Sequence, residues 1–329
     1  MHYVPQIAGL PGGSGHAGWL ISAGRGLLNL WEASPSGGRS GEPALLCMHS
    51  QGTTFTSVCL DADRGSQMLL GASVESSGAE CVTASSLDVE SLLAPKARFP
   101  MPHNGTRAPG RNCLAVASLH SFGGPLAETC VGSYGGALVV WRVGSANKPG
   151  ASSGVPTAVW KAHDALVTSL LKSPFGLTLF SGAADGKVHV WNMREKPNRP
   201  AQQFVHQGRI AALSQINDQQ LLTAAGNGQL MVWDLRNASA PVKFSVPDGK
   251  PIVRAVLSPF ADSAAVATTA GIYSVDLLDE ACSSSRIVPS LRSPVTALVY
   301  NAATSEVVAA GGPGAPGSIS VFRPQLGGY

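Results

Sequence analysis

Short stretches of alternating apolar and polar residues, separated by turn residues, run along most of the chain. In the clearest region, residues 167–174, 177–183 and 187–193 each have the pattern of one strand, with Gly and Asp between them. The same pattern predicts strands near both ends of the chain, at 3–8, 18–23, 27–32, 294–300, 305–311 and 317–323. A period of two residues predicts an all-β protein.

The segment from His163 to Arg236 contains one such unit written twice. Each copy has a His, a hydroxyl residue, an Asp or Asn, and a Trp in the same order. The His and the hydroxyl residue are 18 and 17 positions apart, and the next two intervals, of 4 and 6 positions, are the same in both copies. The residues are His163, Ser181, Asp185 and Trp191 in the first copy and His206, Thr223, Asn227 and Trp233 in the second. A tandem unit of this kind indicates a repeat architecture.

The pattern resembles the WD-repeat family of β-propellers, in which one repeat forms one four-stranded blade. A Gly followed five residues later by a bulky residue extends it along the chain: Gly26 and Trp31, Gly136 and Trp141, Gly186 and Trp191, Gly228 and Trp233, and Gly317 and Phe322. Seven repeats of roughly 40 to 47 residues would use the whole chain. The resemblance therefore implies a single domain over residues 1–329, a seven-bladed propeller with several degenerate blades.

The resemblance also implies a role for the two sets of polar residues. In the family, the Asp holds the His, the His contacts the Ser or Thr, and that hydroxyl reaches the indole N–H of the Trp. His163, Ser181 and Asp185 are the residue types of a hydrolytic triad, but no GxSxG motif surrounds Ser181. We therefore expect a structural network and no enzyme activity. Asn227 should make the second network weaker, and blades without the pattern should be held by apolar packing.

Composition narrows the function classes. Charged residues make up only 13% of the chain, whereas 38 Gly and 23 Pro supply many turns. A net charge of +3 is too small to imply a nucleic-acid surface by itself. No phosphate-binding GxxxxGK[ST] motif and no metal-ligand spacing is present, so we expect no cofactor and no metal.

The cysteines and the hydropathy indicate the compartment. No apolar stretch reaches the 18 or more residues of a membrane span, and the first residues lack the features of a signal peptide. The six cysteines lack CxxC pairs and predict reduced core residues in an intracellular protein, cytoplasmic or nuclear. They are Cys47, Cys59, Cys81, Cys113, Cys130 and Cys282.

Two insertions and the last blade depart from the regular pattern. Residues 89–111 and 144–156 are rich in Pro, Gly and small polar residues, which is typical of solvated loops, and the first insertion is also a candidate contact arm. The sequence offers no clear outer strand for the last blade. This blade is either a short three-stranded sheet or is completed by a strand from another chain.

The two clear repeats end in WNMR and WDLR. These ends resemble the box with which some propellers dock onto the damage-binding adaptor of cullin-RING ubiquitin ligases, and the resemblance places the key cations at Arg194 and Arg236. An Arg at this position can also simply pair with a carboxylate on the bottom face.

A second group of charges lies on connections expected at the top of a propeller. Its positions include Asp164, Arg209, Lys250 and Arg292, which would give a mostly basic rim there. Its ligand would be an acidic or phosphorylated peptide. The alternative is scattered charge that only aids solubility.

These observations predict a non-catalytic scaffold for protein–protein interaction, one propeller subunit of a multisubunit assembly. The partners would be other protein subunits, one of which could donate a strand to the last blade. The alternative is a substrate receptor of a cullin-RING ubiquitin ligase.

Overall fold

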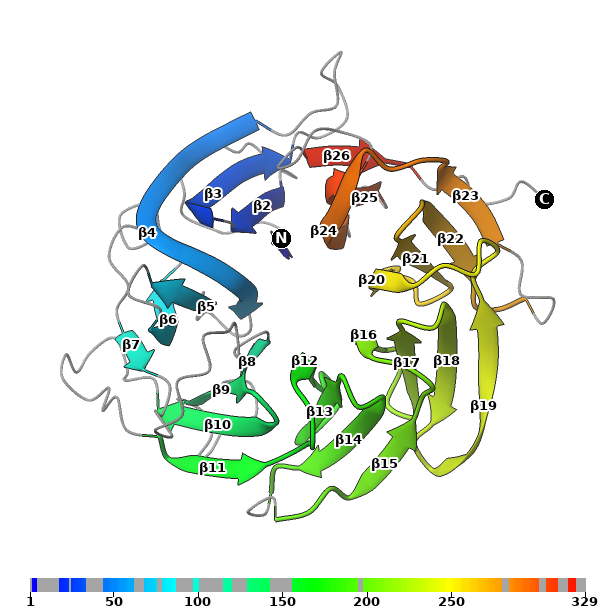
Figure 1. Cartoon of the computed structure of the whole chain (residues 1–329), viewed down its shortest axis with the longest axis horizontal. Coiled ribbons are helices and arrows are strands. Elements are labelled where there is room, and N and C mark those ends of the chain that lie inside the picture. Colours follow the sequence, from blue (N-terminus) through cyan, green and yellow to red (C-terminus); the bar gives the residue numbers. More distant parts are fainter. Residues whose placement is uncertain are drawn as a thin grey trace.

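Antiparallel sheets stand side by side in a ring, each with its first strand nearest the axis (Figure 1). This computed structural model describes residues 2–4, 18–23, 25–33, 44–61, 68–75, 79–86, 97–100, 115–119, 129–142, 156–194, 198–279, 284–301, 306–312 and 319–323. The arrangement is the β-propeller that the alternating strands predict.

The strands of the first two sheets are as follows. The first sheet contains β1 (His2–Val4), β2 (Gly18–Ala23), β3 (Arg25–Ala33), β4 (Ala44–Asp61), β5 (Met68–Glu75), β6 (Glu80–Ser86) and β7 (Ala97–Pro100). The second sheet contains β8 (Val116–Ser118), β9 (Thr129–Tyr134), β10 (Ala137–Arg142) and β11 (Ala158–Lys161).

The remaining sheets follow in chain order. They contain β12 (Val167–Lys172), β13 (Thr178–Ala183), β14 (Lys187–Asn192) and β15 (Gln202–Val205); β16 (Ile210–Gln215), β17 (Gln220–Ala225), β18 (Gln229–Asp234) and β19 (Asn237–Ser245); β20 (Ile252–Leu257), β21 (Ser263–Thr268), β22 (Ile272–Asp276) and β23 (Ser284–Val288); and β24 (Ser293–Asn301), β25 (Glu306–Gly312) and β26 (Ile319–Phe322).

The prediction of seven blades was wrong, because the described strands form six sheets. The cause is β4, an uninterrupted strand of 18 residues. Its first half pairs with β3 and its second half with β5, so the first two predicted blades become one seven-stranded sheet. The segment contains no Pro, and its backbone can therefore stay extended and hydrogen-bonded through both halves.

Part of the first insertion also differs from the expected loop. Residues 97–100 form β7, which pairs with β6. Phe99 on this strand is fully buried, and its ring centroid lies 6.0 Å from that of Trp141 on β10. This part of the insertion therefore belongs to the core. Residues 101–111 and 144–155 lie outside the described part of the chain.

The apolar core lies between neighbouring sheets. Phe180, Val188 and Phe204 from the β12–β15 sheet pack against Ile210, Leu221 and Trp233 from the β16–β19 sheet. Equivalent apolar clusters fill the spaces between the other described neighbours. Sheets that have such a cluster on each side are thus buried on both faces, which explains the long apolar runs in their middle strands.

The ring closes where the two ends of the chain meet. β1 lies beside β24, the inner strand of the last sheet (Figure 1). That sheet has three described strands, β24, β25 and β26, and no described strand pairs with the outer edge of β26.

The turns divide into two faces. The bottom face is the end of the ring that carries the β12–β13 and β14–β15 turns and their equivalents. The top face carries the β13–β14 turn and the connections between sheets, such as residues 206–209 between β15 and β16. Antiparallel pairing places alternate turns at opposite ends of every sheet, so the division holds around the ring.

The regular Gly before each third strand has a physical cause on the top face. Gly186 has a φ of 78°, and a Cβ built there would lie 2.5 Å from the carbonyl oxygen of His206. The Gly186 carbonyl accepts a hydrogen bond of 2.8 Å from the His206 amide. Gly136 approaches the carbonyl of His163 in the same way, with a Cβ distance of 2.3 Å. The repeat therefore keeps Gly because two backbones touch there.

We expect Gly186→Ala to lower the free energy of unfolding by about 2 kcal/mol, because Ala adds a clash and an unfavourable φ. The measurement is urea unfolding followed by tryptophan fluorescence. The control is Gly176→Ala in the β12–β13 turn, where an added Cβ meets no atom within 4 Å. Equal losses in the two variants would contradict this explanation.

Candidate functional site

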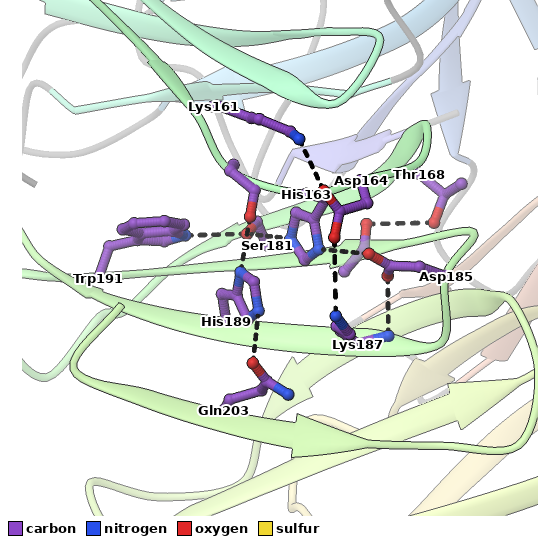
Figure 2. Close-up of polar contacts among 12 residues, drawn as sticks. Lys161, His163, Asp164, Thr168, Ser181, Asp185, Lys187, His189, Trp191 and Gln203 are labelled. Atoms are coloured by element: carbon purple, nitrogen blue, oxygen red, sulfur yellow. Dashed lines mark hydrogen bonds and ion pairs between the residues drawn. The ribbon is translucent and has the colours of Figure 1, made fainter. Parts of the chain in front are cut away.

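The first polar network joins three elements of the β12–β15 sheet and the connection that precedes it. The indole N–H of Trp191 donates to Ser181 Oγ over 2.9 Å, and Ser181 Oγ lies 2.8 Å from His163 Nε2 (Figure 2). Because Ser181 already accepts from Trp191, its own proton can be donated to His163. The other imidazole nitrogen, Nδ1, lies 3.4 Å from Asp185 Oδ2.

This arrangement is unsuited to hydrolysis. Ser181 is completely buried and His163 nearly so, with 0% and 3% of their surfaces exposed. The serine oxygen is occupied by the Trp191 indole and the His163 ring. A nucleophile needs access to a substrate, whereas this hydroxyl links two buried side chains.

A second histidine extends the network, and the sequence comparison of the repeats missed it. The rings of His189 and His163 stack with centroids 4.2 Å apart (Figure 2). His189 Nδ1 donates to the Ala162 carbonyl over 2.7 Å, and Nε2 lies 3.1 Å from Gln203 Oε1 on β15. Only the pairing of Ser181 with His189 across β13 and β14 reveals this position, because the second repeat has Met231 there.

The second network has the same centre but a different turn. Trp233 donates to Thr223 Oγ1 over 2.8 Å, and Thr223 Oγ1 lies 2.5 Å from His206 Nε2. Asn227 Nδ2 donates to Gln229 Oε1, and Asn227 Oδ1 accepts from the Gln229 backbone amide. His206 Nδ1 has no hydrogen-bond partner. His163 Nδ1 makes no hydrogen bond either, but it lies 3.4 Å from the Asp185 carboxylate. The exchange of Asp for Asn therefore removes a nearby negative charge from the second imidazole.

Burial sets the charge of both histidines. Burial and, to a smaller extent, the nearby His189 lower the pKa of His163 to about 4, although Asp185 acts in the opposite direction. Burial alone lowers the pKa of His206 to about 4. Both rings are therefore neutral at pH 7, as a buried imidazole that contacts a hydroxyl requires.

Solved structures resemble this ring at low sequence identity. A crystal structure of Chaetomium thermophilum Raptor matches over 93% of this chain and 27% of its own, with a TM-score of 0.66 and 16% identity. A chain of the mitotic checkpoint complex matches over 94% of this chain and 84% of its own, with a TM-score of 0.62 and 17% identity. The present chain thus spans about a quarter of the Raptor chain, and both likenesses describe the fold.

The repeat itself is recognised by a family model. The model of the WD domain, G-beta repeat, matches residues 154–192, which include the complete network from His163 to Trp191. This chain is a β-propeller that contains a WD repeat. No curated protein matches the sequence. The residues that the structure describes contain no helix that is long and apolar enough to cross a membrane.

The β20–β23 sheet of this WD-repeat propeller contains a polar network that the sequence did not predict. Asp248 Oδ2 accepts hydrogen bonds from Thr268 Oγ1 over 2.8 Å and from the Tyr273 hydroxyl over 3.0 Å. The Lys250 amide donates to Asp248 Oδ1 over 2.9 Å. We expected apolar packing alone here. One feature of the sequence could have revealed this network. The interval from His206 to Asp248 nearly repeats the interval from His163 to His206, so Asp248 occupies the position of the repeat's His.

In the β8–β11 sheet, no polar network of described residues forms around Trp141. The indole nitrogen of Trp141 is buried and makes no hydrogen bond. In the strand pairing, Gly132 occupies the place of Ser181 and Thr223. This sheet is therefore held mainly by apolar contacts, including that between Trp141 and Phe99.

The candidate cations of the WD-repeat propeller lie on opposite faces. Arg209, Lys250 and Arg292 are exposed on connections of the top face, whereas Arg194 and Arg236 are exposed on bottom turns. The structure therefore does not bring the two groups together.

The two arginines of the boxes differ in their surroundings. Their backbone amides donate to the side chains of Asn192 and Asp234, over 3.0 and 2.8 Å. Arg236 also makes a two-point ion pair with Asp234, with distances of 3.0 and 2.7 Å. Asn192 offers no charge, and no described residue pairs with the Arg194 side chain. The turns are thus alike, but only Arg194 is electrostatically uncompensated.

The searched residues of the WD-repeat propeller contain no group of side chains suited to a metal ion. Cys59 on β4 and Cys81 on β6, which are separated by β5, form no disulfide, and Cys81 is buried. Cys113 and Cys282 lie outside the described residues.

The stability of the propeller should fall with acid because His163 and His206 have pKa values near 4 in the folded state and near 6.5 when unfolded. Below pH 6.5 the unfolded chain binds more protons, so stability falls as the pH drops from 6.5 toward 4. We expect about 1 to 2 kcal/mol of loss per histidine by pH 5. Asn227→Asp should reduce the loss, because the new carboxylate raises the pKa of His206.

The measurement is the free energy of unfolding in urea at pH 7, 6 and 5. Asp185→Asn is the matched variant and should leave the loss between pH 7 and pH 5 nearly unchanged, because the folded-state pKa of His163 is already about 4 and the removal of a carboxylate can only lower that pKa further. Identical pH dependence in Asn227→Asp and the unchanged protein would contradict the assignment.

Proposed function

We propose that this propeller, a single domain over residues 1–329, is a non-catalytic interaction subunit of an intracellular multisubunit assembly. The observation that carries the proposal is a pair of exposed phenylalanines on the bottom face. Phe175 and Phe260 are 55% and 72% exposed. They occupy the same turn, between the first and second strands, in the β12–β15 and β20–β23 sheets.

Both phenylalanines follow a Ser-Pro pair whose serine is buried and fixed. The Phe175 amide donates to Ser173 Oγ over 3.1 Å, and the Ser173 amide donates to the Thr178 carbonyl over 2.8 Å. In the other turn, the Ser258 amide donates to the Ser263 carbonyl over 2.8 Å. The local structure thus holds each aromatic ring outward. An ordered aromatic side chain supplies contact area to a partner at low entropic cost.

Other residues give the bottom face a mixed apolar and cationic character. Leu278, in the β22–β23 turn, is 77% exposed. Arg194 adds an uncompensated positive charge in the β14–β15 turn. Exposed apolar groups with polar neighbours are typical of protein interfaces. They support a protein partner on this face.

The edge of the last sheet supports a second contact. β26 is a short, partly buried strand that pairs with β25, and no strand in the described ranges covers its other edge. A strand from another subunit would satisfy its backbone groups by β-augmentation. We include such a donated strand in the proposal.

We expect Phe175→Ser combined with Phe260→Ser to reduce the amount of partner that co-purifies at least several-fold, because both apolar contacts are lost. The measurement is native mass spectrometry of the tagged protein, with cross-linking to locate the contact. Val205→Ser combined with Val242→Ser is the control, since each valine is 56% exposed on an outer strand. A monomer without partners, or equal retention by both variants, would contradict the proposal.

The second candidate function is a substrate receptor of a cullin-RING ubiquitin ligase. It is favoured by the two box turns, which share one backbone geometry and present Arg194 and Arg236 on the same face. We expect Arg194→Ala combined with Arg236→Ala to abolish co-purification of the ligase adaptor while the protein stays folded. Arg194→Ala alone should have the larger single effect, because Arg236 is already paired with Asp234. Circular dichroism checks folding, and unchanged adaptor binding by the double variant would exclude this function.

A further inference from the structure

Three successive connections bring a cation to the start of an inner strand on the top face. Arg209 directly precedes β16, Lys250 lies two residues before β20, and Arg292 directly precedes β24. All three side chains are exposed. The inner strands β16, β20 and β24 are neighbours in the ring (Figure 1). The three cations that precede them therefore follow one arc around its axis.

A fourth cation lies on the inner surface of this arc. Arg254 is the third residue of β20, and its side chain is exposed to water. Its Nε donates to the Thr296 carbonyl on β24 over 2.9 Å, and Nη1 donates to the Val253 carbonyl over 2.7 Å. These two bonds hold the guanidinium in place, while Nη2 has no partner among the described residues.

The cations of this arc form no ion pair with a described carboxylate. The acidic residue on the same connection as Lys250 is Asp248, and its oxygens already accept from Thr268, Tyr273 and the Lys250 amide. No described carboxylate pairs with Arg209 or Arg254. Although the Arg254 side chain reaches water, the protein atoms around it partly desolvate the guanidinium and lower its pKa. The positive charge of Arg209 acts in the same direction.

The neighbouring connection provides a contrast. There Asp164 pairs with Lys161 at 2.7 Å and with Lys187 at 3.9 Å. Bringing two guanidinium groups together without an anion costs free energy, and groups perturbed in this way are typical of binding sites. The unpaired arc is therefore suited to an external anion.

We propose that Arg209 and Arg254, flanked by Lys250 and Arg292, bind an acidic peptide segment of a protein partner on the top face. Guanidinium groups donate paired hydrogen bonds to carboxylate or phosphate oxygens. The backbone carbonyls that anchor Arg254 reduce the entropy lost on binding. Cations spread over three neighbouring sheets match a chain that carries several negative charges better than they match a single small ion. The inference rests on the proposed interaction role but concerns the opposite face.

The test is fluorescence anisotropy with the full chain and two labelled probes, hexaglutamate and a glutamate peptide with a central phosphoserine. We expect saturable binding of both probes and none of labelled hexaglutamine. Arg209→Gln should weaken binding about tenfold, because it removes one desolvated charge contact and breaks no described bond. Arg254→Lys, which keeps the charge but loses the forked donors, should weaken the phosphopeptide more than hexaglutamate.

The matched control is Arg199→Gln, an exposed arginine on the bottom face that makes the same change in net charge. It should leave binding within about twofold. Equal losses in Arg209→Gln and Arg199→Gln, or no saturable binding, would overturn the proposal. Binding of inorganic tripolyphosphate without either peptide would also overturn it and would indicate a small polyanion. Because Arg209→Gln leaves the bottom face and β26 intact, retention of the assembly by this variant separates this inference from the proposed function.

Discussion

Packing between neighbouring sheets is the constraint on which the rest of the molecule depends. The middle strands β13, β14, β17, β18, β21 and β22 are largely buried between sheets, as Phe180 on one sheet and Trp233 on the next illustrate. Such strands can tolerate polar side chains only where these find partners inside the protein. The buried hydroxyl groups of Ser181, Thr223 and Thr268 accordingly have hydrogen-bond partners, whereas the indole nitrogen of Trp141 has none.

The buried networks show three solutions to the same problem. The β12–β15 sheet joins Trp191, Ser181 and His163 with Asp185 at the surface end, and the β16–β19 sheet keeps the centre but has Asn227 in the turn. The β20–β23 sheet uses Asp248 with Thr268 and Tyr273 instead. In each case a residue on the connection that leads into the inner strand is bonded to the second strand. Since a buried hydrogen bond contributes about 1 kcal/mol, these links fix the connections more than they stabilise the fold.

Fixed connections matter for function because they carry the side chains that face outward. Arg209 and Lys250 closely follow His206 and Asp248, so the networks fix the backbone that carries these two long side chains. On the opposite face, the buried serines before Phe175 and Phe260 do the same for the aromatic rings. A stiff ring with two differently equipped faces is suited to bridging several partners.

Much of the architecture followed from local sequence. The period of two, the spacing from His163 to Trp191 and the regular glycines predicted strands, turns and a propeller, because these features act within one repeat. The sequence could not reveal that β4 continues through two predicted blades, since hydrogen bonds to β3 and β5 decide this. It also missed His189, Asp248 and Arg254. Their partners lie on other strands, at separations of 26, 20 and 42 residues for His163, Thr268 and Thr296. The sequence by itself thus determined the repeat and its turns. Only the tertiary structure decided how many sheets form and which polar groups meet, because strand pairing and packing between sheets join residues with no fixed spacing along the chain.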